Sequence, residues 1–215
     1  MLLFLIRRLG GLVATILVAT MVVFAVLELL PGDPASLMLG VNAQPDTIAA
    51  LRTELGLDAP ALLRYLHWVG GMLTGDFGIS YTYRVPVAGL IADRALVSLP
   101  LAAMALLLST AIAIPLGTVA ATAHNRWPDS AVMGFAQLGI AIPNFWFGIL
   151  LVYLFAIALR WVPAGGFAGW DAGPGAALGS LLLPAVALAL PQAAILARVM
   201  RSALLDVLHE DYMRP

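Results

Sequence analysis

The sequence has no cysteine and no lysine among its 215 residues, and only 11% of the residues are charged. Without cysteine there can be no disulfide bond, no thiol nucleophile and no cysteine-bound zinc. Without lysine there can be no Walker-A lysine, no Schiff base and no lysine nucleophile. If ATP drives this protein, another chain must therefore hydrolyse it.

Basic patches and clustered ligands are also missing. The formal net charge of -1 provides no basic surface for nucleic acid. The three histidines, His67, His124 and His209, stand far apart without the spacing of metal ligands. The apolar stretches carry no nucleophile with a base and an acid, and no paired aspartates. We therefore expect no catalytic residue, no metal site and no cofactor in this chain.

Hydrophobic residues make up 62% of the sequence, which is typical of a membrane protein. A membrane-spanning helix needs about 20 apolar residues. Four stretches reach that length, at about residues 9–30, 96–122, 131–159 and 178–199. The first is too long for a typical signal-peptide core, and no clear cleavage site follows it. We predict an all-α, polytopic transmembrane helix bundle in one domain over residues 1–215.

Arginines near the ends of the predicted spans indicate the orientation. Arg7 and Arg8 precede the first span, Arg126 lies in the short loop after the second, and Arg198 and Arg201 lie at the end of the fourth. The positive-inside rule places that side in the cytoplasm. The N-terminus is then cytoplasmic, and the long loop 31–95 is external.

The external loop 31–95 is too apolar for a disordered linker, and it divides into short amphipathic helices. Their expected starts are Asp46-Thr47, Asp58 with Pro60, and Pro86, and the first two are expected to end at Gly56 and Gly75. Trp68 is expected at the depth of the lipid headgroups. These helices form either a structural cap over the bundle or a docking surface for an external protein.

Several helix-breaking residues lie inside the apolar runs. Pro143-Asn144 interrupts the third predicted span, and Pro191-Gln192 interrupts the fourth. Each proline frees backbone groups that lipid cannot satisfy, so each either kinks a packed helix or faces a water-filled cavity. Asn144 and Gln192 could also bond the amides of a polar permeant. Charge is missing from the middle of the spans, which counts against a proton- or sodium-driven transporter.

In order and spacing, these residues resemble one family, the inner-membrane permease subunits of ABC importers for dipeptides, oligopeptides and nickel. The matching segments are Leu30-Pro31-Gly32-Asp33-Pro34, Leu55-Gly56-Leu57-Asp58, Gly75-Asp76-Phe77-Gly78, Ile114-Pro115-Leu116-Gly117, Ile142-Pro143 with Phe145-Trp146, Trp161 with Pro163, and Leu183-Pro184-Ala185.

The resemblance implies a single transmembrane permease domain of an ATP-driven importer in the cytoplasmic (inner) membrane. It implies transport of peptides or similar small solutes, nickel chelates among them. The implied partners are a second homologous permease, two ABC ATPase subunits that bind ATP and magnesium, an external solute-binding protein and membrane lipid. A secondary transporter or channel subunit, or a non-functional permease fragment, remains the alternative.

The resemblance also assigns residues. In the family a cytoplasmic EAA loop follows the span matching 178–199 and couples the permease to the ATPase. Glu210, Asp211, Tyr212 and Arg214 match the start of that loop. The family continues for about two more spans, so the permease domain is expected to be incomplete at its C-terminal side. Pro143, Asn144, Pro191 and Gln192 are the candidate residues of the translocation path.

Overall fold

The computed structural model describes residues 1–30, 32–40 and 43–208. Every regular element in these ranges is a helix, apart from one isolated β-bridge between Ile79 and Pro86. The prediction of an all-α fold is therefore confirmed. The chain divides into two compact units, Met1–Arg94 and Ala95–Pro215, which are described separately.

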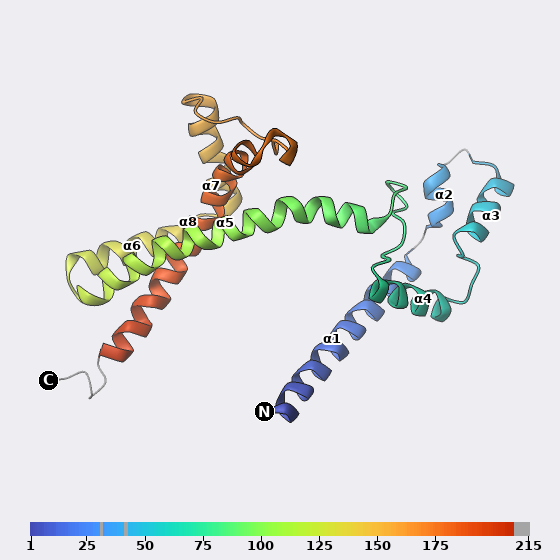
Figure 1. Cartoon of the computed structure of the whole chain (residues 1–215), viewed down its shortest axis with the longest axis horizontal. Helices are drawn as coiled ribbons and strands as arrows, with labels where there is room; N and C mark the ends of the chain where they lie inside the picture. The colour runs from blue at the N-terminus through green and yellow to red at the C-terminus, as the bar shows by residue number, and fades with distance from the viewer. Residues whose placement is uncertain (31, 41–42, 209–215) are drawn as a thin grey trace. The chain divides into compact units, whose positions relative to one another are not determined.

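The first unit contains one long helix and three short ones (Figure 1). They are α1 (Leu2–Leu29), α2 (Pro34–Leu39), α3 (Pro45–Glu54) and α4 (Ala61–Thr74). The amphipathic helices predicted for this loop are present. α4 ends as expected at Gly75, which has a φ of 85° and closes the helix in the left-handed conformation.

Two details of the loop differ from the prediction. α3 starts at Pro45 with Gln44 as its N-cap, so Asp46 lies in the first turn and does not cap the helix. Proline fits the first helical position because its missing N–H would have no helical partner there. The segment around Pro34, expected to be only a break after the first span, starts α2 for the same reason.

α4 packs against the C-terminal part of α1 through aromatic side chains. The ring of Tyr65 meets Phe24 edge to face at 5.5 Å between centroids, and Trp68 lies 6.3 Å from Phe24. The Tyr65 hydroxyl lies 3.1 Å from the Thr20 hydroxyl. Tyr65 is only 7% exposed, so it is the main anchor of α4 on α1.

The second unit contains the remaining helices. They are α5 (Val87–Thr122, which begins in the first unit), α6 (Trp127–Ala141), α7 (Asn144–Leu151) with a π-helical continuation (Val152–Ala158), a 3-10 turn (Trp170–Ala172) and α8 (Pro174–Leu208). α8 contacts α6, α7 and the 3-10 turn. Alanines two positions apart in α8, such as Ala185 and Ala187, are both buried. Such residues point in roughly opposite directions, so α8 is covered on two sides.

Small residues let α5, α6 and α8 approach closely. Ala113 and Ala120 of α5, Val132 of α6 and Ala197 of α8 form one buried cluster. A Cβ added to Gly117 would lie 2.9 Å from the carbonyl oxygen of Ala197. Such contacts are typical of membrane helices, whose association depends on close packing.

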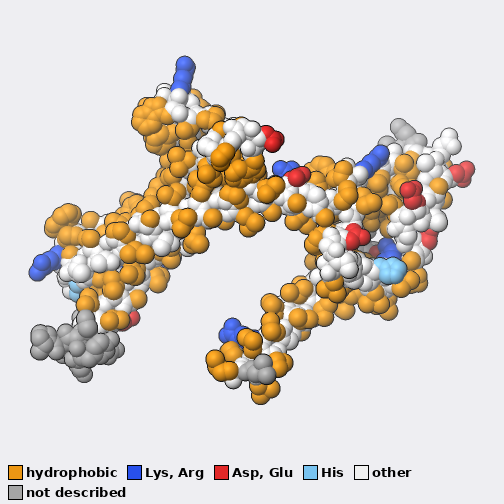
Figure 2. Space-filling view, in the orientation of Figure 1, with side chains coloured by type: hydrophobic (Ala, Val, Ile, Leu, Met, Phe, Trp, Pro, Cys, Tyr) orange, Lys and Arg blue, Asp and Glu red, His pale blue; other side chains and the backbone are white. Residues whose placement is uncertain are grey.

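Three helices, α1, α5 and α8, are long and apolar enough to cross a membrane. α6 and α7 with its continuation would make a fourth span, but they are bent by 98° at a short break. Large apolar side chains are exposed along these helices, and Figure 2 shows them over much of the visible surface. So much exposed apolar surface is unfavourable in water, whereas it is compatible with contact to lipid. A polytopic membrane protein is therefore confirmed.

Candidate functional site

The break between α6 and α7 falls at the predicted Pro143-Asn144 position. Ile142 ends α6 with extended backbone angles (φ -87°, ψ 122°), and Pro143 precedes α7 with φ -61° and ψ 132°. A proline disfavours the helical conformation in the residue before it, which explains why α6 ends here. The first amide groups of α7 have no carbonyl partner within the helix and point out of its end.

α8 contacts this bent pair on both sides of the break. Before the break, a Cβ added to Gly139 would lie 2.6 Å from the Ala194 Cβ and 3.7 Å from the Pro191 Cα. After the break, a Cβ added to Gly148 would lie 3.7 Å from the Ala187 Cβ. The break therefore faces the stretch of α8 that ends at Pro191.

Three of the four candidate path residues keep exposed side chains. Pro143, Asn144 and Gln192 are exposed, whereas Pro191 is buried beneath the contact with α6. The structure brings Pro191 close to the end of α6 through Gly139. α8 runs without a break through Pro191, so the interruption expected in the fourth span does not occur. The helix bond that Pro191 cannot make lies inside the packed part of α8, beside the bend.

An apolar groove runs beside the break, between α7 with its continuation and α8. Its volume is about 560 Å³. Its lining is formed by Phe145, Gly148, Ile149, Val152, Tyr153, Ile157, Leu183, Pro184, Ala187 and Leu188. Tyr153 has the only polar side chain in this set, so the groove suits apolar chains and offers few partners to a charged solute.

A buried ionic cluster lies at the opposite end of α6. The carboxylate of Asp129, which is 4% exposed, accepts two hydrogen bonds from the guanidinium of Arg201 on α8, at 2.5 and 2.6 Å. The backbone N–H of Asn125 donates to the same carboxylate at 3.0 Å. His124 Nδ1 lies 3.0 Å from Nη2 of Arg201. The cluster ties the α5–α6 turn to α8.

The sequence gives little local sign of this cluster. The turn between α5 and α6 has the pattern of a short loop, and Arg201 is one of several arginines near the span ends. The two members of the ion pair are 72 residues apart, so no local spacing connects them. An acidic residue in the first turn of an apolar helix was the available signal, because burial of a carboxylate requires a partner.

The predicted coupling residues Glu210, Asp211, Tyr212 and Arg214 lie outside the described residues. α8 continues to Leu208 and so leads directly to them. Their assignment to ATPase coupling stays a prediction.

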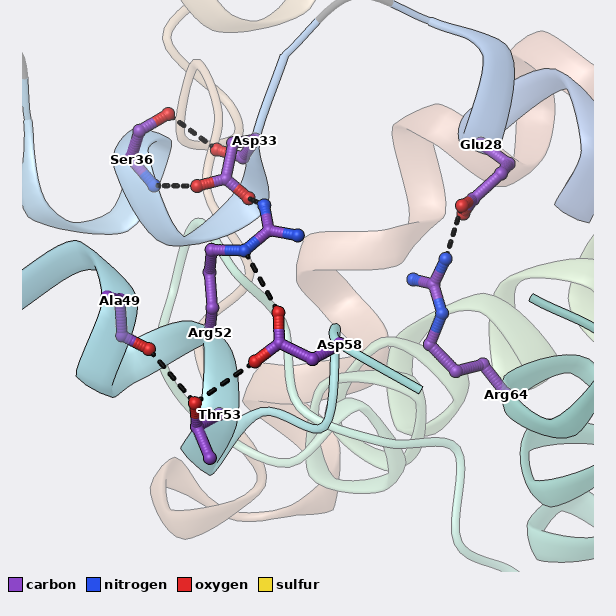
Figure 3. Close-up of polar contacts among 8 residues, drawn as sticks. All are labelled: Glu28, Asp33, Ser36, Ala49, Arg52, Thr53, Asp58 and Arg64. Atoms are coloured by element: carbon purple, nitrogen blue, oxygen red, sulfur yellow. Dashed lines mark hydrogen bonds and ion pairs between the residues drawn. The ribbon is translucent and has the colours of Figure 1, made fainter. Parts of the chain in front are cut away.

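The first unit carries a separate polar network, drawn in Figure 3. Arg52 of α3 binds Asp33 at 2.7 Å and Asp58 at 3.3 Å. Asp33 also caps α2 by accepting a hydrogen bond from the Ser36 amide. Thr53 donates to Asp58 and is the second link between α3 and the turn that follows it. The network fixes α2 and α3 to one another.

A second ion pair in Figure 3 joins α4 to α1. Arg64 binds Glu28, and its guanidinium also lies over the ring of Phe24 at 5.9 Å from the centroid. Trp68 is half-buried against the same ring, so it packs on α1. Its position at the depth of the lipid headgroups stays a prediction. These contacts give the loop after α1 a defined structure.

No group of three or more potential metal ligands occurs among residues 1–30, 32–40 and 43–208. The site consists instead of a broken apolar helix, a proline-containing partner helix and an ionic cluster at one end. These features define an integral membrane protein in which a broken helix packs against a continuous neighbouring helix.

Comparison with known families identifies this protein more closely. Residues 1–102 match the N-terminal part of the binding-protein-dependent transport system membrane component, and residues 113–214 match the binding-protein-dependent transport system inner membrane component. The chain therefore belongs to this family, the inner-membrane permeases of ABC importers.

Individual relatives agree with the family assignment. The glutathione transport system permease protein GsiC of Salmonella typhimurium is 39% identical over 214 residues, which cover 100% of this chain and 67% of GsiC. A protein of Brucella abortus named as a peptide transport system permease is 38% identical over 208 residues, or 97% of this chain and 66% of that protein. The chain thus spans about two thirds of the length of these relatives.

Proposed function

We propose that this chain is a permease subunit of an ATP-driven importer, which moves peptides or similar small solutes across the cytoplasmic membrane. The main support is the similarity to peptide and glutathione permeases along nearly the whole chain. Peptides and glutathione share amide groups and charged ends, so a short peptide is the first substrate to test. Nickel chelates are the second substrate class.

The proposed assembly places this chain beside a second homologous permease. Two ATPase subunits bind ATP and magnesium on the cytoplasmic side, and an external binding protein delivers the solute. The N-terminus of this chain is cytoplasmic. A ligand shifts a conformational equilibrium only if it binds the two states differently, so ATP and the loaded binding protein must each favour one state.

In this proposal the permease residues perform no covalent chemistry. Asn144 and Gln192 are exposed near the break and can bond the amides of a permeant. Pro143 lies at the break, and Pro191 removes one backbone hydrogen bond from the facing part of α8. Glu210, Asp211, Tyr212 and Arg214 contact the ATPase and receive its movement.

The test is uptake of labelled dipeptide, tripeptide and glutathione by the source organism with and without this reading frame. Deletion should lower uptake of at least one of these solutes, and a plasmid copy should restore it. Arsenate, which depletes ATP, should abolish the same uptake. An uncoupler that collapses the proton gradient while ATP is maintained should leave it largely intact. Uptake that follows the proton gradient and ignores ATP would exclude the importer function.

Two substitutions test the assigned residues. Asn144→Leu should lower uptake while the amount of protein in the membrane stays constant, and unchanged uptake would remove Asn144 from the path. A photocrosslinker at Tyr212 should capture an ATPase subunit. If the crosslinker never captures one in the assembled transporter, the coupling assignment is wrong.

A further inference from the structure

Asp129, in the first turn of α6, is only 4% exposed. Among the described residues, it is the only charged side chain that is buried. A carboxylate withdrawn from water needs a close partner, and Arg201 supplies a planar, two-point contact. Such a contact fixes the orientation of both helices as well as their separation.

The turn before Asp129 is shaped around this carboxylate. Asn125 has a φ of 59°, a conformation that non-glycine residues rarely adopt, and its N–H points to the carboxylate. His124 lies against both charged partners, 3.4 Å from the carboxylate of Asp129 and 3.0 Å from Arg201. The turn between α5 and α6 is thereby tied directly to α8.

Close apolar packing continues from the ion pair into the three helices. A Cβ added to Gly117 of α5 would lie 2.7 Å from the Cβ of Met200, the residue before Arg201. Ala197, one turn earlier on α8, belongs to the buried cluster with α5 and α6. Packed interfaces of this kind shift between discrete arrangements and do not deform smoothly. The ends of the three helices therefore form one block.

We propose that the Asp129–Arg201 pair is a mechanical clamp that makes α6 move together with α8. The inference rests on the proposed transport function, because it concerns how movement from the ATPase reaches the path. α8 leads to the predicted coupling residues at one end of the clamp. α6 leads from the clamp to the break at Pro143, about 20 Å away at the usual rise per residue. Without this ion pair, α8 can move without displacing the turn between α5 and α6.

The first experiment replaces each partner in the assembled transporter. Asp129→Asn and Arg201→Gln keep similar side-chain sizes but remove the charge pair. Asp206→Asn and Arg198→Gln make the same chemical changes at exposed positions of α8 and serve as matched controls. Uptake, ATP hydrolysis without binding protein, and the amount of assembled complex are measured for each variant.

We expect uptake to fall about tenfold in the two clamp variants, whereas basal ATP hydrolysis per assembled complex changes less than roughly twofold. The two control variants should show the same uptake and ATP hydrolysis as the unaltered chain. Uptake that stays within roughly twofold of the unaltered chain would overturn the clamp. So would an equal fall of uptake and of basal ATP hydrolysis per assembled complex, because that pattern indicates a general structural defect and no specific loss of coupling.

A rescue experiment covers the case in which the charge variants assemble poorly. The chain has no cysteine, so Asp129→Cys with Arg201→Cys creates a unique reactive pair. Before crosslinking, this double variant should transport poorly. A short bifunctional thiol reagent should restore uptake, because a permanent link replaces the clamp. If the link forms and uptake is not restored, the clamp proposal is wrong.

The two proposals fail in different ways. If the unaltered chain supports no ATP-dependent uptake, the proposed function is wrong. If the unaltered chain transports and the clamp variants couple ATP hydrolysis to uptake equally well, only the clamp is wrong.

Discussion

At the scale of single residues, Gly139 and Gly134 of α6 make a matched pair. Gly139 faces α8, where an added Cβ would lie 2.6 Å from the Ala194 Cβ, whereas a Cβ at Gly134 meets nothing within 4 Å. A methyl group attached to backbone cannot move aside, so Gly139→Ala should lower the free energy of unfolding by about 1–3 kcal/mol. Gly134→Ala should be neutral or raise it by up to about 1 kcal/mol, because alanine favours helix.

Both variants can be compared by unfolding the protein from detergent micelles with increasing denaturant. We expect the denaturation midpoint to fall in Gly139→Ala and to rise or stay unchanged in Gly134→Ala. Equal midpoints for the two variants would show that α6 and α8 do not pack as closely as described.

Tyr65 supports a second residue-scale prediction. Its hydroxyl lies 3.1 Å from the Thr20 hydroxyl and donates to the Leu17 carbonyl at 3.3 Å. Interhelical hydrogen bonds in membrane proteins contribute about 0.6 kcal/mol on average and up to about 1.7 kcal/mol. Tyr65→Phe should lower the unfolding free energy by that order, and Thr20→Val should have little additional effect in the double variant.

The matched control is Tyr83→Phe, because Tyr83 is 67% exposed. Its effect should stay within about 0.5 kcal/mol. Strictly additive effects of Thr20→Val and Tyr65→Phe in the same unfolding assay would exclude the hydrogen bond between the Tyr65 and Thr20 hydroxyls.

At the scale of elements, Asp33 has two separable functions in α2. Its carboxylate caps the helix by accepting from the Ser36 amide, and it binds Arg52 at 2.7 Å. Asparagine keeps the cap and loses the charge, whereas alanine loses both. Asp33→Ala should therefore destabilise α2 by about 1 kcal/mol more than Asp33→Asn does.

Hydrogen exchange of the α2 amides measures this difference directly. We expect faster exchange in Asp33→Ala and an intermediate rate in Asp33→Asn. If the two variants exchange equally fast, the ion pair with Arg52 and not the cap stabilises α2.

The bend between α6 and α7 yields an element-scale prediction for Pro143. Alanine at this position releases the conformational restriction on Ile142, so α6 and α7 can join into one straighter helix. Spin labels on cysteines introduced at Gly134 and Tyr153 should then report a longer or broader distance distribution in Pro143→Ala than in the unaltered background.

Pro128→Ala is the control for this measurement, because Pro128 lies in the first turn of α6, where proline fits a helix. Its distance distribution should not change. An unchanged distribution in Pro143→Ala as well would mean that packing on α8 sets the 98° bend without help from proline.

At the scale of the whole molecule, the proposed orientation can be tested with single cysteines in this cysteine-free chain. A cysteine at Thr82, in the long loop after α1, should react with an impermeant thiol reagent added outside intact cells. A cysteine at Asn125, in the α5–α6 turn, should react only after the cells are opened. The opposite pattern would place the N-terminus outside and reverse the assignment of the coupling side.

Local chemistry determined the type of each element. Long apolar runs predicted helices that cross a membrane, and the α1, α5 and α8 helices have the required length and hydropathy. Gly75 ends α4 as predicted, because glycine adopts the left-handed conformation at a helix end without steric strain. The predicted start of α3 was wrong. Proline and aspartate both favour helix starts, and only the backbone conformation shows that the helix begins at Pro45 with Asp46 in its first turn.

The sequence by itself indicated that Pro143 could interrupt the helix, because proline disfavours the helical conformation of the residue before it. Pro115 and Pro191 lie inside continuous helices, so only the tertiary structure decided which proline breaks the backbone. The sequence could not determine the 98° angle of the bend or the close contact of Gly139 with α8, because both depend on the residues that pack opposite. The Asp129–Arg201 pair likewise belongs to the tertiary structure alone. Its members are 72 residues apart, and only the packing of α8 against α6 brings them together. The Arg201 guanidinium then compensates for the hydration that the buried Asp129 carboxylate has lost.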